Sequence, residues 1–220
     1  KIIETVSFLE FQYISTGVVF LLIILFPLVA FTNYATLILK GFAFFLLFLS
    51  FKFFIEIRHL IKKIKFNFND FYFIFFLLLV FLYFLLSLSP LTAADVLDYH
   101  SGVALNILRF NQYTIFPEWF TSLQSGSGEV LIALGFSLGA EQFGSLVQFA
   151  SILSISGIII KISKKNSNFS SDYFTILTIL TCPILIFLLS GSKPQIFYSS
   201  ILFFAFFLNF VKFKKQDYYK

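Results

Sequence analysis

Long apolar runs separated by polar stretches dominate this chain. An α-helix needs about 20 apolar residues to cross the hydrocarbon core of a bilayer, and most of the runs reach or approach that length. The pattern predicts an all-α fold, a polytopic transmembrane helical bundle with five or six spans. The runs cover residues 18–31, 35–54, 71–91, 142–160, 174–191 and 196–211.

The longest polar stretch, 92–141, lies between the third and fourth runs. A loop of that length without structure of its own is uncommon, so we expect amphipathic helices lying along the membrane surface. The expected order is a helix, a break, a flexible turn and a shorter helix, at Ala93–Phe110, Asn111–Pro117, Ser125–Gly128 and Glu129–Leu138.

Basic residues gather in three stretches, 52–65, 161–165 and 212–220. These stretches alternate with stretches that are nearly free of lysine and arginine, and they share one side if each later run crosses the membrane once. Loops rich in lysine and arginine stay in the cytoplasm. The acidic stretch 92–141 is therefore predicted to be extracytoplasmic.

Composition supports the membrane prediction, because 59% of the 220 residues are hydrophobic and 12% are charged. Soluble domains are about half apolar and about a quarter charged. The net charge of +5 comes from lysines at the ends of apolar runs, where they orient helices. Membrane lipid, and no nucleic acid, is the expected partner, and the expected location is the bacterial inner (plasma) membrane.

The chain divides by pattern into two N-terminal spans with a basic loop (1–70) and a transmembrane core (71–220). It begins at Lys1 and ends just after an apolar run, so we expect an N-terminal fragment of a longer protein. Cys182 lies inside an apolar run and is expected to be a buried, inert thiol.

A polar stripe follows the run 71–91. At about 100° per residue, one face of the predicted helix carries Asp95, Asp98, Tyr99, Gly102, Asn106 and Arg109. A functional site is one interpretation; the other is a solvated face, with Thr92 and Asp95 as a helix-capping pair. His100 falls on the apolar side, which favours a packing role, and Glu118 and Glu129 are expected to be solvated loop acids.

The motif D-x-x-D-Y-H at 95–100, directly after an apolar span, resembles the first extracytoplasmic loop of GT-C type membrane glycosyltransferases. This superfamily includes the protein mannosyltransferases and the bacterial aminoarabinose transferases. Asp95, Tyr99 and His100 match its pattern. Three further stretches are similar to the continuing loop, its second surface helix and the next outer loop: 115–120 (IFPEWF), 128–139 (GEVLIALGFSLG) and 190–195 (SGSKPQ).

The resemblance implies transfer of a sugar, with inversion, from a polyprenyl-phosphate donor to an acceptor on the extracytoplasmic side. Asp95 would be the catalytic carboxylate, and Asp98 would assist it or share a divalent metal ion with it. The residues implied in substrate binding are Tyr99, His100, Arg109, Trp119 and Lys193.

Two other functions stay open at this point. A transporter or flippase would carry charges at depth within its spans, whereas only Lys40 and Lys52 lie within runs and no broken helix pair is evident. A non-catalytic membrane scaffold would leave the acidic stripe without a role. The chain contains no G-x-G-x-x-G or P-loop motif, which excludes a soluble nucleotide-binding enzyme of those types.

Overall fold

A computed structural model describes residues 11–63, 70–113, 123, 126–163 and 169–216 of the chain. The regular elements in these residues are helices, and no strand occurs among them. The predicted all-α class is therefore confirmed. The helices are α1 (Phe11–Ala30), α2 (Ala35–Lys63), α3 (Phe71–Ser87), the π-helical turn η2 (Val96–His100), α4 (Ser101–Phe110), α5 (Ser127–Phe136), α6 (Phe143–Ser163), α7 (Phe169–Leu180), α8 (Pro183–Ser190) and α9 (Gln195–Gln216).

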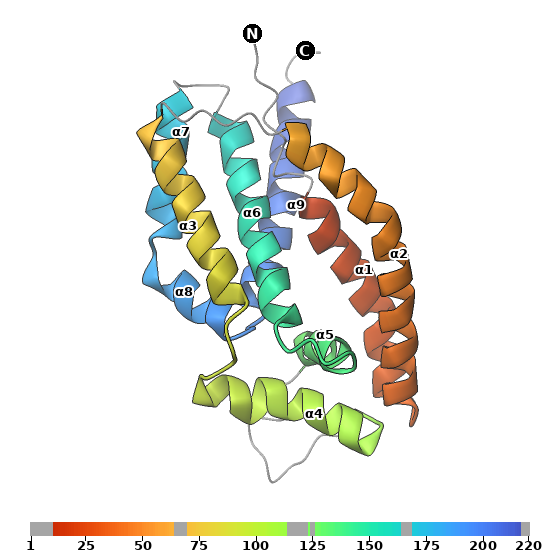
Figure 1. Cartoon of the computed structure of the whole chain (residues 1–220). Coiled ribbons are helices and arrows are strands. Elements are labelled where there is room, and N and C mark those ends of the chain that lie inside the picture. The colour runs from red at the N-terminus through yellow and green to blue at the C-terminus, as the bar shows by residue number, and fades with distance from the viewer. Residues whose placement is uncertain (1–10, 64–69, 114–122, 124–125, 164–168, 217–220) are drawn as a thin grey trace.

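The long helices run side by side as a bundle, and α4 lies across one end of it (Figure 1). α5 sits between α4 and the ends of the long helices. The C-terminal ends of α2, α6 and α9 lie at the opposite end of the bundle from α4. The described parts of the three basic stretches thus share one end, as the charge pattern predicts.

Asn111 ends α4 and fastens it to the start of α2. Its backbone is left-handed, with φ +60°, a conformation that asparagine tolerates better than most residues. Its side-chain oxygen accepts from the Thr36 backbone N–H at 2.9 Å, and its carbonyl oxygen accepts from that of Ala35 at 3.0 Å. These two N–H groups belong to the first turn of α2, where no helical partner exists. The break predicted at Asn111 is confirmed.

α7 and α8 form a broken pair of helices. Their axes differ by 63°, and the break falls before Pro183, which has no N–H to continue the helical hydrogen bonds. The run 174–191 was expected to be one span, and the expectation that no helix pair is broken is wrong. Cys182, at the break, is exposed, so the expectation of a buried thiol is wrong too.

The two N-terminal helices share a hydrophobic core with the helices at the end of the bundle. Buried residues of α1 and α2, among them Leu25 and Leu39, pack with Ile107 of α4 and Val130 of α5. A second core joins α3 to α6, α7, α8 and α9. The proposed division at residue 70 stays a prediction, but α1 and α2 take part in holding α4 and α5 in place.

α5 is buried all round rather than amphipathic. Its residues Gly128–Gly135 are all buried, because α1, α2, α4 and α6 surround it. The prediction that this segment is an amphipathic surface helix is therefore wrong. α4 does have an exposed polar side, with Arg109 exposed and Ile107 buried, although Leu105 is exposed where an apolar contact was expected.

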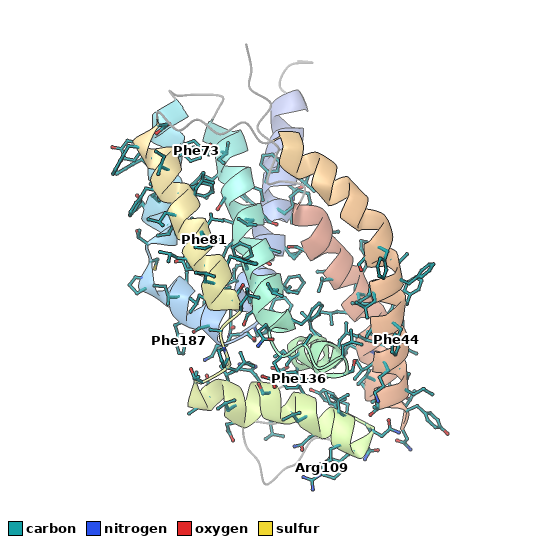
Figure 2. The ribbon with its side chains drawn as sticks, in the orientation of Figure 1. Phe44, Phe73, Phe81, Arg109, Phe136 and Phe187 are labelled. Atoms are coloured by element: carbon teal, nitrogen blue, oxygen red, sulfur yellow. The ribbon has the colours of Figure 1, made fainter. Side chains whose placement is uncertain are left out.

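Large apolar side chains cover much of the outer surface of the bundle (Figure 2). Phe48 and Phe51 of α2 are 75% and 79% exposed, and Leu202 of α9 is 72% exposed. By length and composition, one described helix qualifies as a membrane span, Phe143–Ile160 within α6, and α7 with α8 qualifies together as a bent span. In the part of the chain that the structure describes, the apolar stretches of the other apolar helices are 10–17 residues long.

Candidate active site at the α4 end of the bundle

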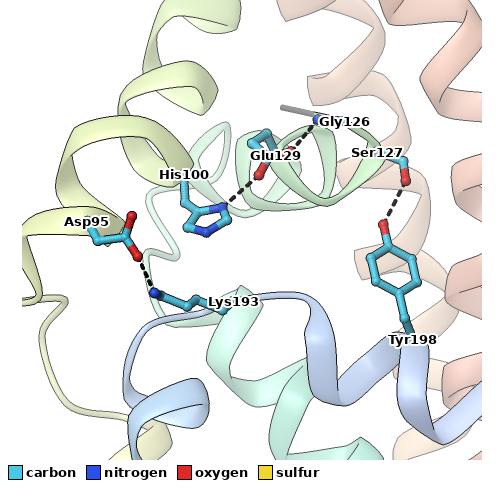
Figure 3. A network of polar contacts seen from close by, with 7 residues as sticks. All are labelled: Asp95, His100, Gly126, Ser127, Glu129, Lys193 and Tyr198. Carbon is cyan, nitrogen blue, oxygen red and sulfur yellow. Dashed lines mark hydrogen bonds and ion pairs between the residues drawn. The ribbon is translucent and has the colours of Figure 1, made fainter. Parts of the chain in front are cut away.

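Asp95 and Lys193 form an ion pair where three segments meet (Figure 3). Asp95 directly precedes η2, and Lys193 belongs to the short connector 191–194 between α8 and α9. The Lys193 Nζ donates to Asp95 Oδ2. Two candidates 98 positions apart in sequence are thereby brought together, which the sequence did not predict.

The two partners of this pair differ in burial. The Lys193 side chain is 8% exposed, while that of Asp95 is 47% exposed. The Lys193 ammonium also lies 4.3 Å from the centre of the Phe187 ring, within the range of a cation–π contact. The charge of the Lys193 ammonium is therefore compensated mainly by Asp95 and the Phe187 ring, whereas water also solvates the Asp95 carboxylate.

The connector 191–194 is wedged between η2 and α5. A Cβ atom on Gly191 would lie 2.8 Å from Val96 Cγ2, and one on Gly128 would lie 2.7 Å from Pro194 Cγ. Both distances are shorter than real Cβ contacts. Glycine at these two positions therefore allows the connector to approach both helical segments and to present Lys193 to Asp95.

His100 and Glu129 form a second, fully buried pair beside the first (Figure 3). His100 Nδ1 and Glu129 Oε1 are 2.6 Å apart, and the two side chains are 3% and 4% exposed. The backbone N–H of Gly126 donates to Glu129 Oε2, also at 2.6 Å. The burial expected for His100 on the apolar side of its helix is confirmed, while its role in substrate binding stays a prediction.

Glu129 is the residue that sequence analysis missed, since its expected place was in solvent. The signal that would have found it is the glutamate at the third helical position after a Ser/Gly turn, the pattern of a capping box. The Glu129 side chain reaches back to the N–H of Gly126, which precedes α5. An otherwise apolar helix following the turn indicates that this cap is buried.

Two more of the predicted site residues, Asp98 and Arg109, have described side chains. Asp98 is exposed on η2, and Arg109 is exposed in the last turn of α4, at the opposite end of that helix from η2 (Figure 2). The Tyr99 side chain, Glu118 and Trp119 lie outside the described residues. Among the described residues, no three His, Cys, Asp or Glu side chains converge as metal ligands would; the divalent ion on Asp95 and Asp98 stays a prediction.

Other polar contacts continue across this end of the bundle. Ser127 Oγ and the Tyr198 hydroxyl are 2.8 Å apart, and Ser145 Oγ and Ser192 Oγ are 2.7 Å apart. α5, α6, α9 and the connector thus meet through hydroxyl groups. An apolar groove of about 330 Å³ next to these contacts is lined by Val19, Leu22, Ile23, Phe26, Pro27, Ser127, Phe197 and Tyr198.

Residues 49–220 match the family model of the DUF1420 N-terminal domain. The chain belongs to this family. No curated protein and no solved structure matches the chain. The matched region of the DUF1420 domain contains the Asp95–Lys193 pair, the His100–Glu129 pair and the connector, whereas α1 and the first part of α2 precede it. The family description names no activity, so the function has to be argued from the chemistry of the site.

Proposed function

We propose that this chain is a polytopic membrane protein whose α4 end faces away from the cytoplasm. The apolar outer surface supports the proposal, because soluble monomers rarely expose contiguous apolar patches of more than a few hundred Å². The lysine-bearing ends of α2, α6 and α9 lie opposite α4, and loops rich in lysine and arginine stay in the cytoplasm. Asp95 would then lie at the outer rim of the bilayer.

We further propose that the intact protein is a GT-C type glycosyltransferase that uses a polyprenyl-phosphate sugar. The observation that carries the proposal is the Asp95–Lys193 pair, half open to solvent, beside a helix that lies across the outer end of the bundle. In an inverting transfer to a hydroxyl acceptor, a carboxylate can take the acceptor's proton and an ammonium can stabilise the charge of the leaving phosphate.

In the proposed reaction, the acceptor oxygen forms a bond to the anomeric carbon as the bond from that carbon to the phosphate oxygen breaks. The Asp95 carboxylate takes the acceptor's proton. The phosphate leaves with the bonding electron pair, and the Lys193 ammonium stabilises its charge. Lys193 would pair with Asp95 before the donor arrives and with the phosphate afterwards, which frees the carboxylate to act as a base.

The other candidates keep secondary roles in this proposal. Asp98, exposed near Asp95, would assist the carboxylate or share a divalent ion with it. Tyr99 and Trp119 would contact the sugar, and Arg109 would contact lipid phosphate from the far end of α4. The acceptor and the donor sugar are open in this proposal.

The test is transfer activity of the full-length protein in proteoliposomes. A panel of radiolabelled polyprenyl-phosphate sugars would be supplied with extracted cell-envelope acceptors, and incorporation would be counted. Asp95→Asn is expected to lower the rate by at least about 100-fold, the lower range for loss of a general base. Full activity in the Asp95→Asn variant would refute the assignment.

Two further variants distinguish a loss of chemistry from a loss of folding. Asp95→Asn combined with Lys193→Met removes both charges together, so an inactive but thermally stable double variant would support a chemical role. Asp70→Asn changes an aspartate at the opposite end of the bundle, where Asp70 caps α3 by accepting from the Tyr72 N–H at 3.0 Å. Asparagine caps helices equally well, so this control should keep full activity.

A transporter is the second candidate, and the break between α7 and α8 favours it. Broken helices near the middle of a membrane often form the substrate sites of transporters. Uptake of labelled substrate without any covalent transfer of sugar, in the same proteoliposomes, would favour this alternative.

A further inference from the structure

We propose that Glu129, acting through His100, is the positioning residue that aims Asp95 at its site. The inference rests on the proposed function for the role of Asp95, but its geometry can be tested separately. Glu129 uses both carboxylate oxygens, one for His100 Nδ1 and one for the Gly126 N–H, each at 2.6 Å. One buried side chain thus joins the turn before α5 to the helical segment that begins at Asp95.

The π-helical turn explains how Asp95 and His100 can serve the same site. In an α-helix, residues five apart are about 140° apart around the axis, at about 100° per residue. A π turn joins residues i and i+5, as in the bond from the Ser101 N–H to the Val96 carbonyl, and its wider turn brings residues five apart closer together around the axis than an α-helix does. Asp95 and His100 are five apart, so the turn directs both side chains towards the same region (Figure 3).

The connector completes the arrangement from the other side. It touches η2 where Gly191 meets Val96 and touches α5 where Gly128 meets Pro194. Lys193 therefore lies between the segment that carries Asp95 and the turn that carries Glu129. Glu129 from α5, Lys193 from the connector and Asp95 from its own segment lie around His100 (Figure 3). Moving any one segment would change the distance between Asp95 and Lys193.

Glu129→Gln is a specific test of this linkage. A carboxylate accepts at both oxygens, whereas a glutamine amide accepts at one atom and donates at the other. The variant therefore keeps the shape of the side chain but either loses one of the two contacts or moves the His100 proton from Nδ1 to Nε2. A buried donor left without an acceptor destabilises the fold, and the coupling to Asp95 should weaken with it.

The first experiment reads the position of the proton on His100. His59 is the other histidine in the chain, so a His59→Gln background with ¹⁵N-labelled histidine leaves one imidazole to observe. Long-range ¹⁵N–¹H spectra of the full chain in nanodiscs should show a proton on Nδ1, because Glu129 accepts there. A neutral ring protonated at Nε2 instead would overturn the proposal.

The second experiment separates positioning from general packing. His100→Asn keeps a donor near the place of Nδ1, whereas His100→Gln moves it to the place of Nε2. The Asn variant should keep the wild-type melting temperature within about 1 °C, and the Gln variant should lose about 2–4 °C, the shift typical of one lost hydrogen bond in a chain of this size. Equal losses would show that His100 only fills space, which would contradict the proposal.

A double-mutant cycle then tests the link to the catalytic pair. The loss of melting temperature caused by Glu129→Gln should be smaller in a Lys193→Met background than in the wild type, because groups in one network do not act additively. Equal losses in both backgrounds would overturn the positioning role. None of these measurements depends on glycosyl transfer, so the transferase proposal can fail while the positioning role stands, and the reverse is also possible.

Discussion

The Asp95–Lys193 pair is asymmetric, and this asymmetry determines what each residue contributes to stability. The Lys193 side chain is almost completely buried, while water reaches about half of Asp95. Removing one partner of a buried ion pair leaves an uncompensated charge inside the protein, which costs about 3–5 kcal/mol. A charge that water can solvate costs much less when it loses its partner.

Asp95→Asn is therefore expected to destabilise the protein more than Lys193→Met does. The first variant leaves a buried ammonium with the Phe187 ring and a neutral amide as its neighbours, and should lower the free energy of unfolding by on the order of 2–3 kcal/mol, at the low end because Asp95 is half exposed. The second should lower it by about 1 kcal/mol or less. Urea unfolding in detergent, followed by circular dichroism, compares them. A larger loss for Lys193→Met would contradict the burial argument.

At the residue scale, the sequence indicated which residues belong to the site but not which of them form pairs. Asp95 and Lys193 both stood out, the first from its motif and the second from its place in an outer loop. Their pairing depends on the crossing of α8 and α9 near η2, which no local pattern encodes. Glu129 looked like a loop acid because its burial comes from helices distant in sequence.

At the scale of elements, the apolar runs predicted where helices form. They did not predict the break between α7 and α8 or the burial of α5. All six runs form helices over most of their length, which satisfies the backbone hydrogen bonds within each segment. The sequence signal for the break between α7 and α8 is Pro183, which has no N–H to continue the helical hydrogen bonds. The burial of α5 could not be predicted from its own residues, since a helix that is apolar all round has no polar face to indicate which side meets solvent.

The turn before α5 provides a matched test of how closely the connector is packed. Gly128→Ala would place a Cβ 2.7 Å from Pro194 Cγ, whereas nothing lies within 4 Å of a Cβ on Gly126. The proline ring cannot rotate away, so Gly128→Ala should cost about 1–3 kcal/mol through overpacking.

Gly126→Ala is the control, because its φ of −161° is open to any residue and its N–H stays available to Glu129. It should change stability by no more than about 0.5 kcal/mol. Thermal unfolding of the two variants side by side gives the comparison. A tolerated Gly128→Ala would mean that the connector is free to move away from α5.

At the scale of the whole molecule, polar chemistry and basic charge lie at opposite ends of an apolar bundle. The Asp95–Lys193 pair, the His100–Glu129 pair and the hydroxyl contacts lie at the α4 end, and the described lysine-bearing helix ends lie at the other. Between them the exposed surface is rich in phenylalanine, leucine and isoleucine. Such a sequence of layers matches the profile of a bilayer with its two aqueous faces.

This layering predicts the labelling of single cysteines in intact cells. In a Cys182→Ser background, Asp98→Cys should react with a membrane-impermeant maleimide, because it is exposed at the α4 end. Lys63→Cys, at the end of α2 on the opposite face, should react only after the cells are permeabilised. Phe48→Cys is exposed in the isolated bundle but should stay unlabelled in both conditions, because lipid would cover it and thiolates do not form there. Labelling of positions 98 and 63 from the same side would remove Asp95 from the outer rim and, with it, the proposed access of a lipid-linked donor.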